Sequence, residues 1–260
     1  MRILTMTLVL VAALLQGCGG KEERDEGPNA EEAYAAANRA LTAKNYPEAI
    51  RLYRDLTIRF PFGRHAEQAM LDMAYAEFKG GRPEAATATL DRFLRTYPTH
   101  PNVDYAWYMK GLVNYEQTMN FLETLMPGRV SDRDQQSAHQ SFRDFQELIR
   151  RHPDSRYIAD ARQRMVFLRN IMAEYEIEVG SYYARRGAHV AALNRARYVL
   201  ENYPGAPATI EALELMASSY DRLKMPELAQ DTRRVLDLNY ADLIDDDKRG
   251  GLLKRLWPFD

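Results

Sequence analysis

Cysteine is almost absent from this chain of 260 residues, which contains only Cys18. One thiol cannot form a disulfide within the chain, and it cannot supply a zinc or iron–sulfur site built from several cysteines. An excess of charge is lacking too, because 35 Lys plus Arg face 37 Asp plus Glu, a formal net charge of −2. Binding of nucleic-acid phosphates needs clustered cations in excess, so this balance excludes a generally basic nucleic-acid binder.

Glycine and proline are also scarce, with 14 and 12 residues, whereas Ala, Leu, Arg and Glu are abundant. The hydrophobic fraction of 46% is ordinary for a folded protein and too high for a disordered one. The composition therefore favours a folded, all-helical protein.

Motifs of enzyme chemistry are missing. The five histidines form no HExxH pair, no glycine-rich loop follows a strand, and there is no nucleophile elbow. Asp245-Asp246-Asp247 with Gly250 is similar to the start of a calcium loop, but its twelfth position is Leu256 instead of Glu. We expect no enzyme activity, no catalytic or metal-binding residue and no cofactor.

The N-terminus has the order of features of a secretion signal. Met1-Arg2 is followed by the uncharged run Ile3 to Leu15, which is too short to span a bilayer but suits the core of a signal peptide. The run ends in Leu15-Gln16-Gly17-Cys18, which resembles the lipobox of a bacterial lipoprotein signal. We predict a signal peptide over 1–17 and, as the resemblance implies, acylation of Cys18. Gly19 in place of Asp favours the outer membrane.

Residues 18–29 carry many charges and little apolar surface, so we expect a flexible tether. Several acyl chains on one cysteine anchor a protein stably, whereas a single chain is marginal.

A pattern with offsets 0, 4, 7 and 12 recurs along the rest of the chain. Its copies are Ala49-Tyr53-Leu56-Pro61, Ala86-Leu90-Phe93-Pro98, Ser141-Phe145-Leu148-Pro153 and Ala192-Ala196-Val199-Pro204, with a degenerate fifth copy, Ala229-Arg233-Leu236. Offsets of 4 and 7 mark one helix face, and the proline stops the helix. Small residues twelve positions earlier, where a partner helix comes close, are Ala37, Ala74, Gly180 and Ala217.

Each unit is thus a helical hairpin of roughly 34 to 37 residues, the length of a tetratricopeptide (TPR) repeat. A generic helical bundle would not keep these offsets four times. We predict an all-α, TPR-type α-solenoid of five helical hairpins.

The third repeat departs from the period. From its small residue, Gly111, to Ser141 there are 30 residues where other repeats have 12, so 18 are inserted. From Ser141 to Gly180 there are 39 where 25 are expected, and Tyr157 to Ala184 contains no proline. We predict one long helix joining repeats three and four. The predicted organisation is a module of repeats 1–3 (residues 30–155), a module of repeats 4–5 (156–240) and a tail (241–260).

First-helix residues at −3, +1 and +4 from the small position line the concave groove of TPR hairpins. In the first three repeats they include Tyr34, Asn38, Leu71, Tyr75, Phe78, Tyr108 and Tyr115. An aromatic cleft with few polar groups suits an extended peptide with apolar side chains. The alternative is that these aromatics fill the hairpin core.

Arginine is enriched in the middle of the chain. Residues 143–197 hold eleven Arg against seven Asp plus Glu. This band is either a docking face or, as such patterns more commonly are, solvated helix surface.

Several short motifs together resemble one family, the outer-membrane assembly lipoproteins called BamD, YfiO or ComL. Besides the lipobox they are Phe60-Pro61-Phe62-Gly63, Asp91 to Arg95 running on to Pro98-Thr99-His100-Pro101-Asn102, Asp104-Tyr105, Ser131-Asp132-Arg133-Asp134, and Gly187-Ala188 with Val190-Ala191 and Asn194-Arg195. The resemblance covers Cys18 to about Tyr240. Phe60 departs from the more usual Tyr of the family.

The resemblance implies a non-enzymatic, lipid-anchored subunit of the β-barrel assembly (BAM) complex on the periplasmic face of the outer membrane. It implies docking of the last POTRA domain of BamA through Arg195, contact with other BAM lipoproteins, and no nucleic acid. It also implies that the N-terminal repeats receive the C-terminal signal of unfolded outer-membrane proteins, near Phe60 and Gly63.

Two other classes of protein are alternatives. One is a periplasmic TPR coordinator of cell-wall synthesis, similar to CpoB, but such proteins carry an N-terminal coiled coil and residues 21–29 have no heptads. The other is a cell-wall enzyme with a TPR body, which requires a pair of carboxylates in a cleft.

Overall fold

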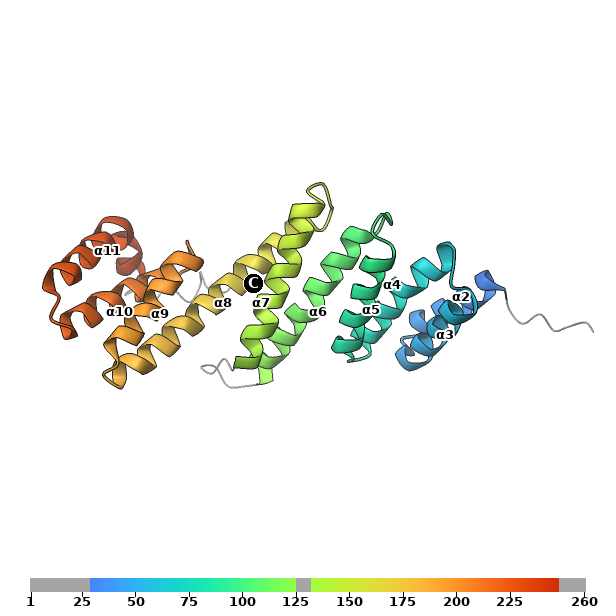
Figure 1. Ribbon diagram of the computed structural model, residues 1–260, viewed down its shortest axis with the longest axis horizontal. Helices are drawn as coiled ribbons and strands as arrows, with labels where there is room; N and C mark the ends of the chain where they lie inside the picture. Colours follow the sequence, from blue (N-terminus) through green and yellow to red (C-terminus); the bar gives the residue numbers. More distant parts are fainter. Residues whose placement is uncertain (1–28, 125–131, 248–260) are drawn as a thin grey trace, which may run out of the picture. The chain divides into compact units, whose positions relative to one another are not determined.

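The computed structural model describes residues 29–124 and 132–247, and within these ranges the regular structure is entirely α-helical (Figure 1). The helices are α2 (Ala30–Thr42), α3 (Tyr46–Arg59), α4 (Arg64–Lys79), α5 (Pro83–Thr96), α6 (Val103–Thr124), α7 (Asp132–Arg151), α8 (Ile158–Arg185), α9 (His189–Asn202), α10 (Thr209–Arg222) and α11 (Pro226–Asp247). They form five consecutive pairs, which confirms the predicted all-α fold of five helical hairpins. The chain divides into two compact units, one ending at Ala69 and the other beginning at Met70.

The first unit contains the hairpin of α2 and α3. Asn29 begins α2 with a capping box, because its side chain accepts a hydrogen bond from the Glu32 backbone N–H (2.9 Å) and the Glu32 carboxylate accepts one from the Asn29 N–H (3.1 Å). Asn45 caps α3, and Pro47 lies in its first turn, where the missing N–H costs nothing. The α3 helix ends at Arg59, and its C-cap, Phe60, precedes the predicted stop Pro61.

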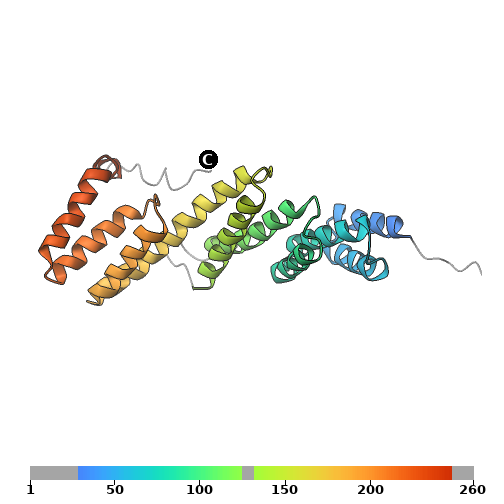
Figure 2. The same ribbon diagram turned by 45° about the horizontal axis from the view of Figure 1, so that its top comes forward.

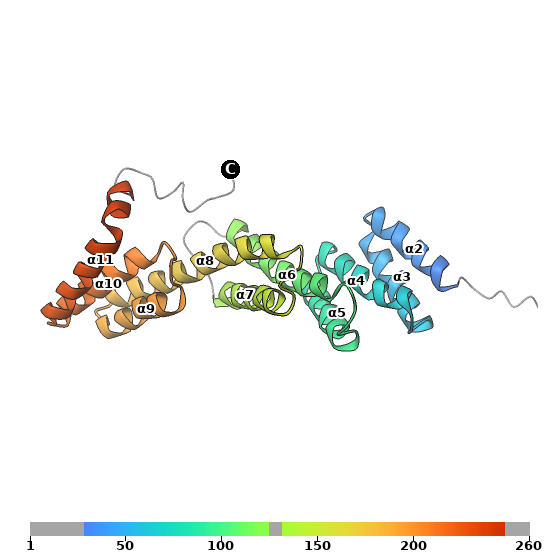
Figure 3. The ribbon, with the colours of Figure 1, turned by 90° about the horizontal axis from the view of Figure 1, so that it is seen from above.

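The second unit stacks its hairpins in chain order, with α5 on α6, α7 on α8, and α9 on α10 (Figure 3). One hydrophobic cluster joins α4, α5 and α6 around Leu71, Leu90 and Phe93. A second cluster extends from α6 to α10 and includes Phe145 and Leu168. Burial of these apolar faces is the main term that stabilises the stack.

The small positions of the repeats are buried as predicted, and the third repeat shows why they are small. A Cβ atom on Gly111 would lie 2.4 Å from the Phe145 ring, so only glycine allows α6 and α7 to approach this closely. The Ser141 hydroxyl donates a hydrogen bond to the Gly111 carbonyl (2.8 Å) across the same contact. The buried small residues are Ala37, Ala74, Gly111, Gly180 and Ala217.

The extra residues of the third repeat lengthen its helices. The α6 helix has 22 residues and α7 has 20, compared with 14 in α5, and residues 125–131, between these two helices, lie outside the described part of the chain. The predicted long helix is α8, which has 28 residues and packs against both α7 and α9 (Figure 2, yellow to orange). The helical hairpins are therefore present in the irregular third repeat as well, and the predicted long helix follows it.

The predicted division into modules at residue 155 stays a prediction. The second hydrophobic cluster runs across this position, because it contains Phe145 of α7 and Val199 of α9. The α11 helix continues through the first seven residues of the predicted tail and ends at Asp247, and the rest of that tail lies outside the described residues.

Candidate interaction surfaces

The predicted anchor, Cys18, lies outside the described residues, as do the signal peptide and nearly all of the tether. Its acylation stays a prediction. Among the described residues, no helix is both long and apolar enough to cross a bilayer.

Four of the predicted groove residues belong to the first unit. Tyr34 is half-buried, and its ring lies 5.9 Å from the ring of Tyr53 and 5.5 Å from that of His65. Asn38 is exposed on α2, and its backbone carbonyl accepts a hydrogen bond from the Thr42 hydroxyl (2.9 Å). These two residues share one helix face, as their spacing requires.

Phe60 and Gly63 lie in the turn that ends α3. Phe60 is half-buried, with the Arg59 guanidinium 5.5 Å from its ring centre. Gly63 has φ of +93°, a backbone conformation that disfavours any side chain, and its carbonyl accepts the N–H groups of Ala66 and Glu67 at the start of α4. The glycine is therefore a requirement of the turn.

The remaining predicted groove residues belong to the second unit and differ in exposure. Leu71 is completely buried and Tyr115 is 6% exposed, so both side chains pack in the core. Tyr75 is exposed, at 36%, and Phe78 is partly buried with the Lys79 ammonium 4.7 Å from its ring centre. Direct contact with a peptide is therefore open to Tyr75 and Phe78, but not to Leu71.

Tyr108 is built into a contact between α6 and the start of α8. Its ring stacks on the ring of Tyr157 at 4.5 Å and 14°, and its hydroxyl donates a hydrogen bond to the Asp160 carboxylate at 2.7 Å. Arg164 donates to the same carboxylate at 2.6 Å. Tyr157, Asp160 and Arg164 were not predicted from the sequence, because the groove rule considers only positions −3, +1 and +4 from the small residue, which is Gly180 in this hairpin. No local pattern indicates that residues 52 positions apart meet here.

The electrostatics of this contact keep the Tyr108 phenol neutral. Burial and the hydrogen bond to Asp160 raise the pKa of Tyr108 to about 12. Burial alone would raise the pKa of Asp160, but the hydrogen bonds from Arg164 and Tyr108 outweigh it and hold that pKa below its usual value. At neutral pH the Asp160 carboxylate therefore accepts hydrogen bonds from two donors, the Tyr108 hydroxyl and the Arg164 guanidinium.

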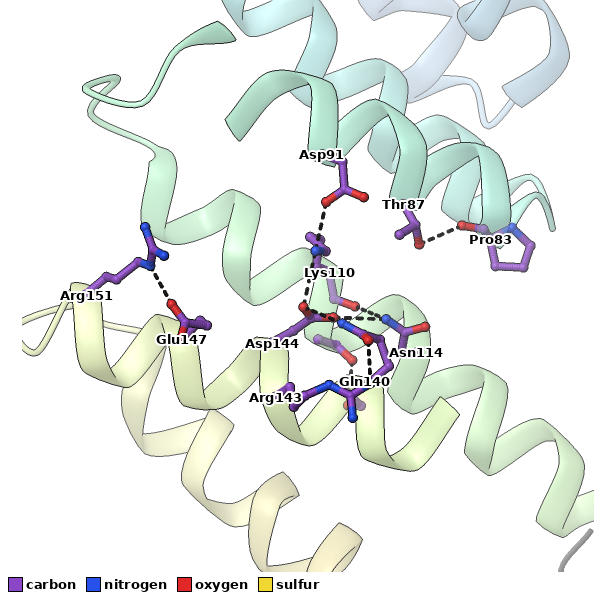
Figure 4. Close-up of polar contacts among 12 residues, drawn as sticks. Pro83, Thr87, Asp91, Lys110, Asn114, Gln140, Arg143, Asp144, Glu147 and Arg151 are labelled. Atoms are coloured by element: carbon purple, nitrogen blue, oxygen red, sulfur yellow. Dashed lines mark hydrogen bonds and ion pairs between the residues drawn. The ribbon is translucent and has the colours of Figure 1, made fainter. Parts of the chain in front are cut away.

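A polar network crosses the hydrophobic interface of α5, α6 and α7 (Figure 4). The Lys110 ammonium lies 2.8 Å from Asp91 and 3.2 Å from Asp144, and the Asp144 carboxylate also accepts hydrogen bonds from Asn114 (3.1 Å) and Gln140 (3.0 Å). Lys110 is 7% exposed and Asp144 is 2% exposed. Burial lowers the pKa of Lys110, but Asp91 and Asp144 outweigh it, so the net shift is upward and the ammonium stays charged.

Arg195, the predicted docking residue, lies on α9 and faces a shallow pocket. Its Nη1 donates to the buried Glu176 carboxylate of α8 at 2.9 Å, and the arginine side chain is 42% exposed. The pocket has a volume of about 360 Å³ and is lined by Tyr183, Ala191, Asn194, Arg195 and Tyr198. The hydrogen bond to Glu176 and the negative charge of that carboxylate raise the pKa of Arg195, and they outweigh partial burial, which lowers it.

Within the described residues, no group of three or more His, Cys, Asp or Glu side chains is arranged to hold a metal ion.

Comparison with known proteins identifies the family. The model of the YfiO family, described as outer membrane lipoprotein, matches residues 26–236. The chain is 38% identical over 257 residues to the outer membrane protein assembly factor BamD of Neisseria meningitidis serogroup B, covering 98% of this chain and 94% of the relative. It is 40% identical to BamD of Neisseria gonorrhoeae (91% and 89% covered) and 34% identical to BamD of Vibrio cholerae (92% and 99% covered).

One solved structure of a TPR protein is only distantly similar. A TPR protein of Thermus thermophilus covers 86% of this chain with 13% identity and a TM-score of 0.38, from which we draw nothing further. The match of the family model over most of the chain, together with these relatives, shows that the protein belongs to the YfiO/BamD family of non-enzymatic outer membrane lipoproteins that serve as assembly factors.

Proposed function

We propose that the protein is a lipid-anchored scaffold of the β-barrel assembly complex that docks the last POTRA domain of BamA through Arg195. The observation that carries the proposal is the half-exposed guanidinium of Arg195 at the rim of an open pocket. Asn194 and Tyr198 of the same helix line this pocket, so the motif that resembles the family contact is on an accessible surface.

The geometry of Arg195 suits a partner carboxylate. Glu176 binds only Nη1, and Nε and Nη2 have no hydrogen-bond partner among the described residues. These two N–H groups form one edge of the guanidinium and can bind a carboxylate with two parallel hydrogen bonds. Glu176 holds the side chain in place, which reduces the conformational entropy lost on docking.

The test is copurification of a POTRA-bearing barrel protein with Arg195→Gln from detergent-solubilised outer membranes. Loss of a desolvated charge pair costs roughly 2–5 kcal/mol, so we expect binding to weaken at least about 30-fold. Arg197→Gln is the matched control, because Arg197 is exposed on the same helix and is not part of the pocket. Undiminished copurification of Arg195→Gln would contradict the proposed contact.

Stability must be separated from docking in this test, because Arg195→Gln leaves the buried Glu176 without its cation. The double variant Arg195→Gln/Glu176→Gln removes both charges, and we expect it to melt close to the unmodified protein while docking stays lost. Recovery of docking in the double variant would show that the single variant acted only through stability.

We further propose that the N-terminal repeats receive the C-terminal signals of unfolded outer-membrane proteins. The exposed ring of Tyr75, the partly buried ring of Phe78 and, in the first unit, the half-buried rings of Tyr34 and Phe60 support this function. Aromatic surfaces suit a peptide with alternating apolar residues and an aromatic end. Acylation of Cys18 and contact with other BAM lipoproteins complete the proposal.

A further inference from the structure

A second pocket lies next to the Lys110 network, where α5 and α7 end and α6 begins. It has a volume of about 210 Å³ and is lined by Leu94 of α5, Pro98 of the following loop, Val103 and Trp107 of α6, and Arg151 and His152 at the end of α7. Four of these six residues have apolar side chains or rings. The volume is about that of one bulky side chain, so the pocket fits a single apolar anchor.

Several N–H groups of this pocket have no hydrogen-bond partner among the described residues. The Arg151 Nε donates to Glu147 at 2.5 Å (Figure 4), but its two Nη groups have no hydrogen-bond partner among the described residues. The indole N–H of Trp107 and the imidazole of His152 also have no hydrogen-bond partner in the described ranges. Trp107 and Arg151 can only donate, and therefore this pocket is suited to a ligand that accepts hydrogen bonds.

Two cations lie against the indole of Trp107. The Lys110 ammonium lies 5.0 Å and the Arg151 guanidinium 5.3 Å from the Trp107 ring, which orients both against the aromatic face. Arg95 and Arg150 are the exposed sequence neighbours of Leu94 and Arg151, but neither lines the pocket. Arg151 is thus the arginine of the arginine-rich band that lies beside this apolar hollow.

We propose that this pocket binds a segment of a partner protein in which a bulky apolar side chain lies next to an aspartate or glutamate. The apolar side chain fills the space between Leu94, Val103 and Trp107, and the carboxylate pairs with the free Nη groups of Arg151. Charge complementarity favours an acidic segment over a basic or neutral one, and an apolar wall favours a protein segment over a phosphate group alone.

The proposal goes beyond the docking of BamA through Arg195, because its pocket uses α5, α6 and α7 and none of the residues of α8 or α9. The two contacts can therefore fail independently.

The experiment places the photo-crosslinking residue p-benzoylphenylalanine at the exposed position 95, beside the pocket, in the full-length lipoprotein in its outer membrane. After irradiation and detergent solubilisation, mass spectrometry identifies the crosslinked segment. We expect an internal segment of another protein with an acidic residue within two positions of a bulky apolar one. Arg151→Glu should reduce this adduct at least tenfold, and an acid-to-lysine change in the partner segment should restore it.

Arg150→Glu is the matched control, since Arg150 is the adjacent exposed arginine, also pairs with Glu147, and does not line the pocket. We expect its adduct to stay within twofold of the unmodified protein. Trp107→Phe keeps the ring but removes the N–H, and should reduce the adduct severalfold with circular dichroism unchanged.

Four results would overturn the proposal. They are an adduct insensitive to Arg151→Glu, an adduct equally sensitive to Arg150→Glu, a crosslinked segment without an acidic residue, and a crosslink only to a second copy of this chain, to lipid or to the free C-terminus of a barrel substrate. Copurification of the POTRA-bearing protein, measured in the same preparation, reports separately on the contact at Arg195.

Discussion

Tyr75 and Leu71 lie four residues apart on α4, yet one side chain is 36% exposed and the other is completely buried. A residue on the exposed side can contact a peptide without loss of stability, whereas a residue on the buried side contributes through packing. Substitution of Tyr75 therefore tests a role in binding, whereas substitution of Leu71 tests a role in stability.

Tyr75→Ala should weaken binding of a synthetic peptide with an aromatic C-terminus by roughly 2 kcal/mol, the cost of truncating a hot-spot aromatic. Its melting temperature should change little. Leu71→Ala, in contrast, should destabilise the fold by about 2–5 kcal/mol, because it leaves a cavity in the core. Fluorescence anisotropy measures the binding and thermal unfolding the stability. Equal binding by Tyr75→Ala and the unmodified protein would remove Tyr75 from the proposed peptide site.

At the scale of helices, Lys110 connects α5, α6 and α7, because it pairs with one carboxylate on each neighbouring helix. The ammonium of α6 lies against Asp91 of α5 and Asp144 of α7, with the Asp144 carboxylate nearly inaccessible to solvent. Desolvating these charges is costly, and the network compensates only while every partner is present. We therefore expect this network to help fix the register in which the second and third hairpins pack.

Lys110→Met should destabilise the protein by about 3–5 kcal/mol, because it leaves Asp144 buried without a cation. Adding Asp144→Leu should recover much of this loss, since both charges are then gone. Lys79→Met is the control: the Lys79–Glu116 pair is on the surface, 3.6 Å apart, and its removal should cost less than about 1 kcal/mol. Denaturant unfolding measures all three. A Lys110→Met effect as small as that of Lys79→Met would show that the network adds no stability.

At the scale of the whole molecule, the family model that matches residues 26–236 is described as outer membrane lipoprotein. A lipoprotein carries a covalent lipid, and because Cys18 is the only cysteine in the sequence, we expect the anchor there. We expect the described repeats to fold without it, because side chains of α4 to α10 and of the loops between them form the hydrophobic clusters that hold the second unit together.

Cys18→Ser should abolish incorporation of labelled fatty acid and move the protein from the outer-membrane fraction to the soluble periplasm or leave it uncleaved at the inner membrane. Its helicity and melting temperature should match those of the unmodified protein. Fractionation with radiolabelled palmitate measures the first effect, and circular dichroism the second. Acylated Cys18→Ser in the outer membrane would disprove the proposed anchor.

The repeat pattern was readable from the sequence because each hairpin repeats the same local requirements. A small residue, an apolar face at offsets of 4 and 7 and a terminal proline act within one hairpin, so their spacing predicts both the helices and the buried positions. Gly111 and Ser141 were recognisable as the small pair of repeat three even across an insertion, and the structure places them in contact. Family membership was likewise evident from short motifs.

Exposure and pairing were decided by the tertiary structure alone. The groove rule assigned Leu71, Tyr75 and Tyr115 to the same surface, but the packing of neighbouring helices buries two of them and exposes the third. Tyr108 and Asp160 meet because α8 follows α7 back across α6, and Arg151 faces Trp107 because α7 ends where α6 begins. The sequence by itself determined which faces are apolar, since helical period is local. Only the stacking of distant helices determined which side chains remain free to bind, because burial depends on neighbours far apart in the chain.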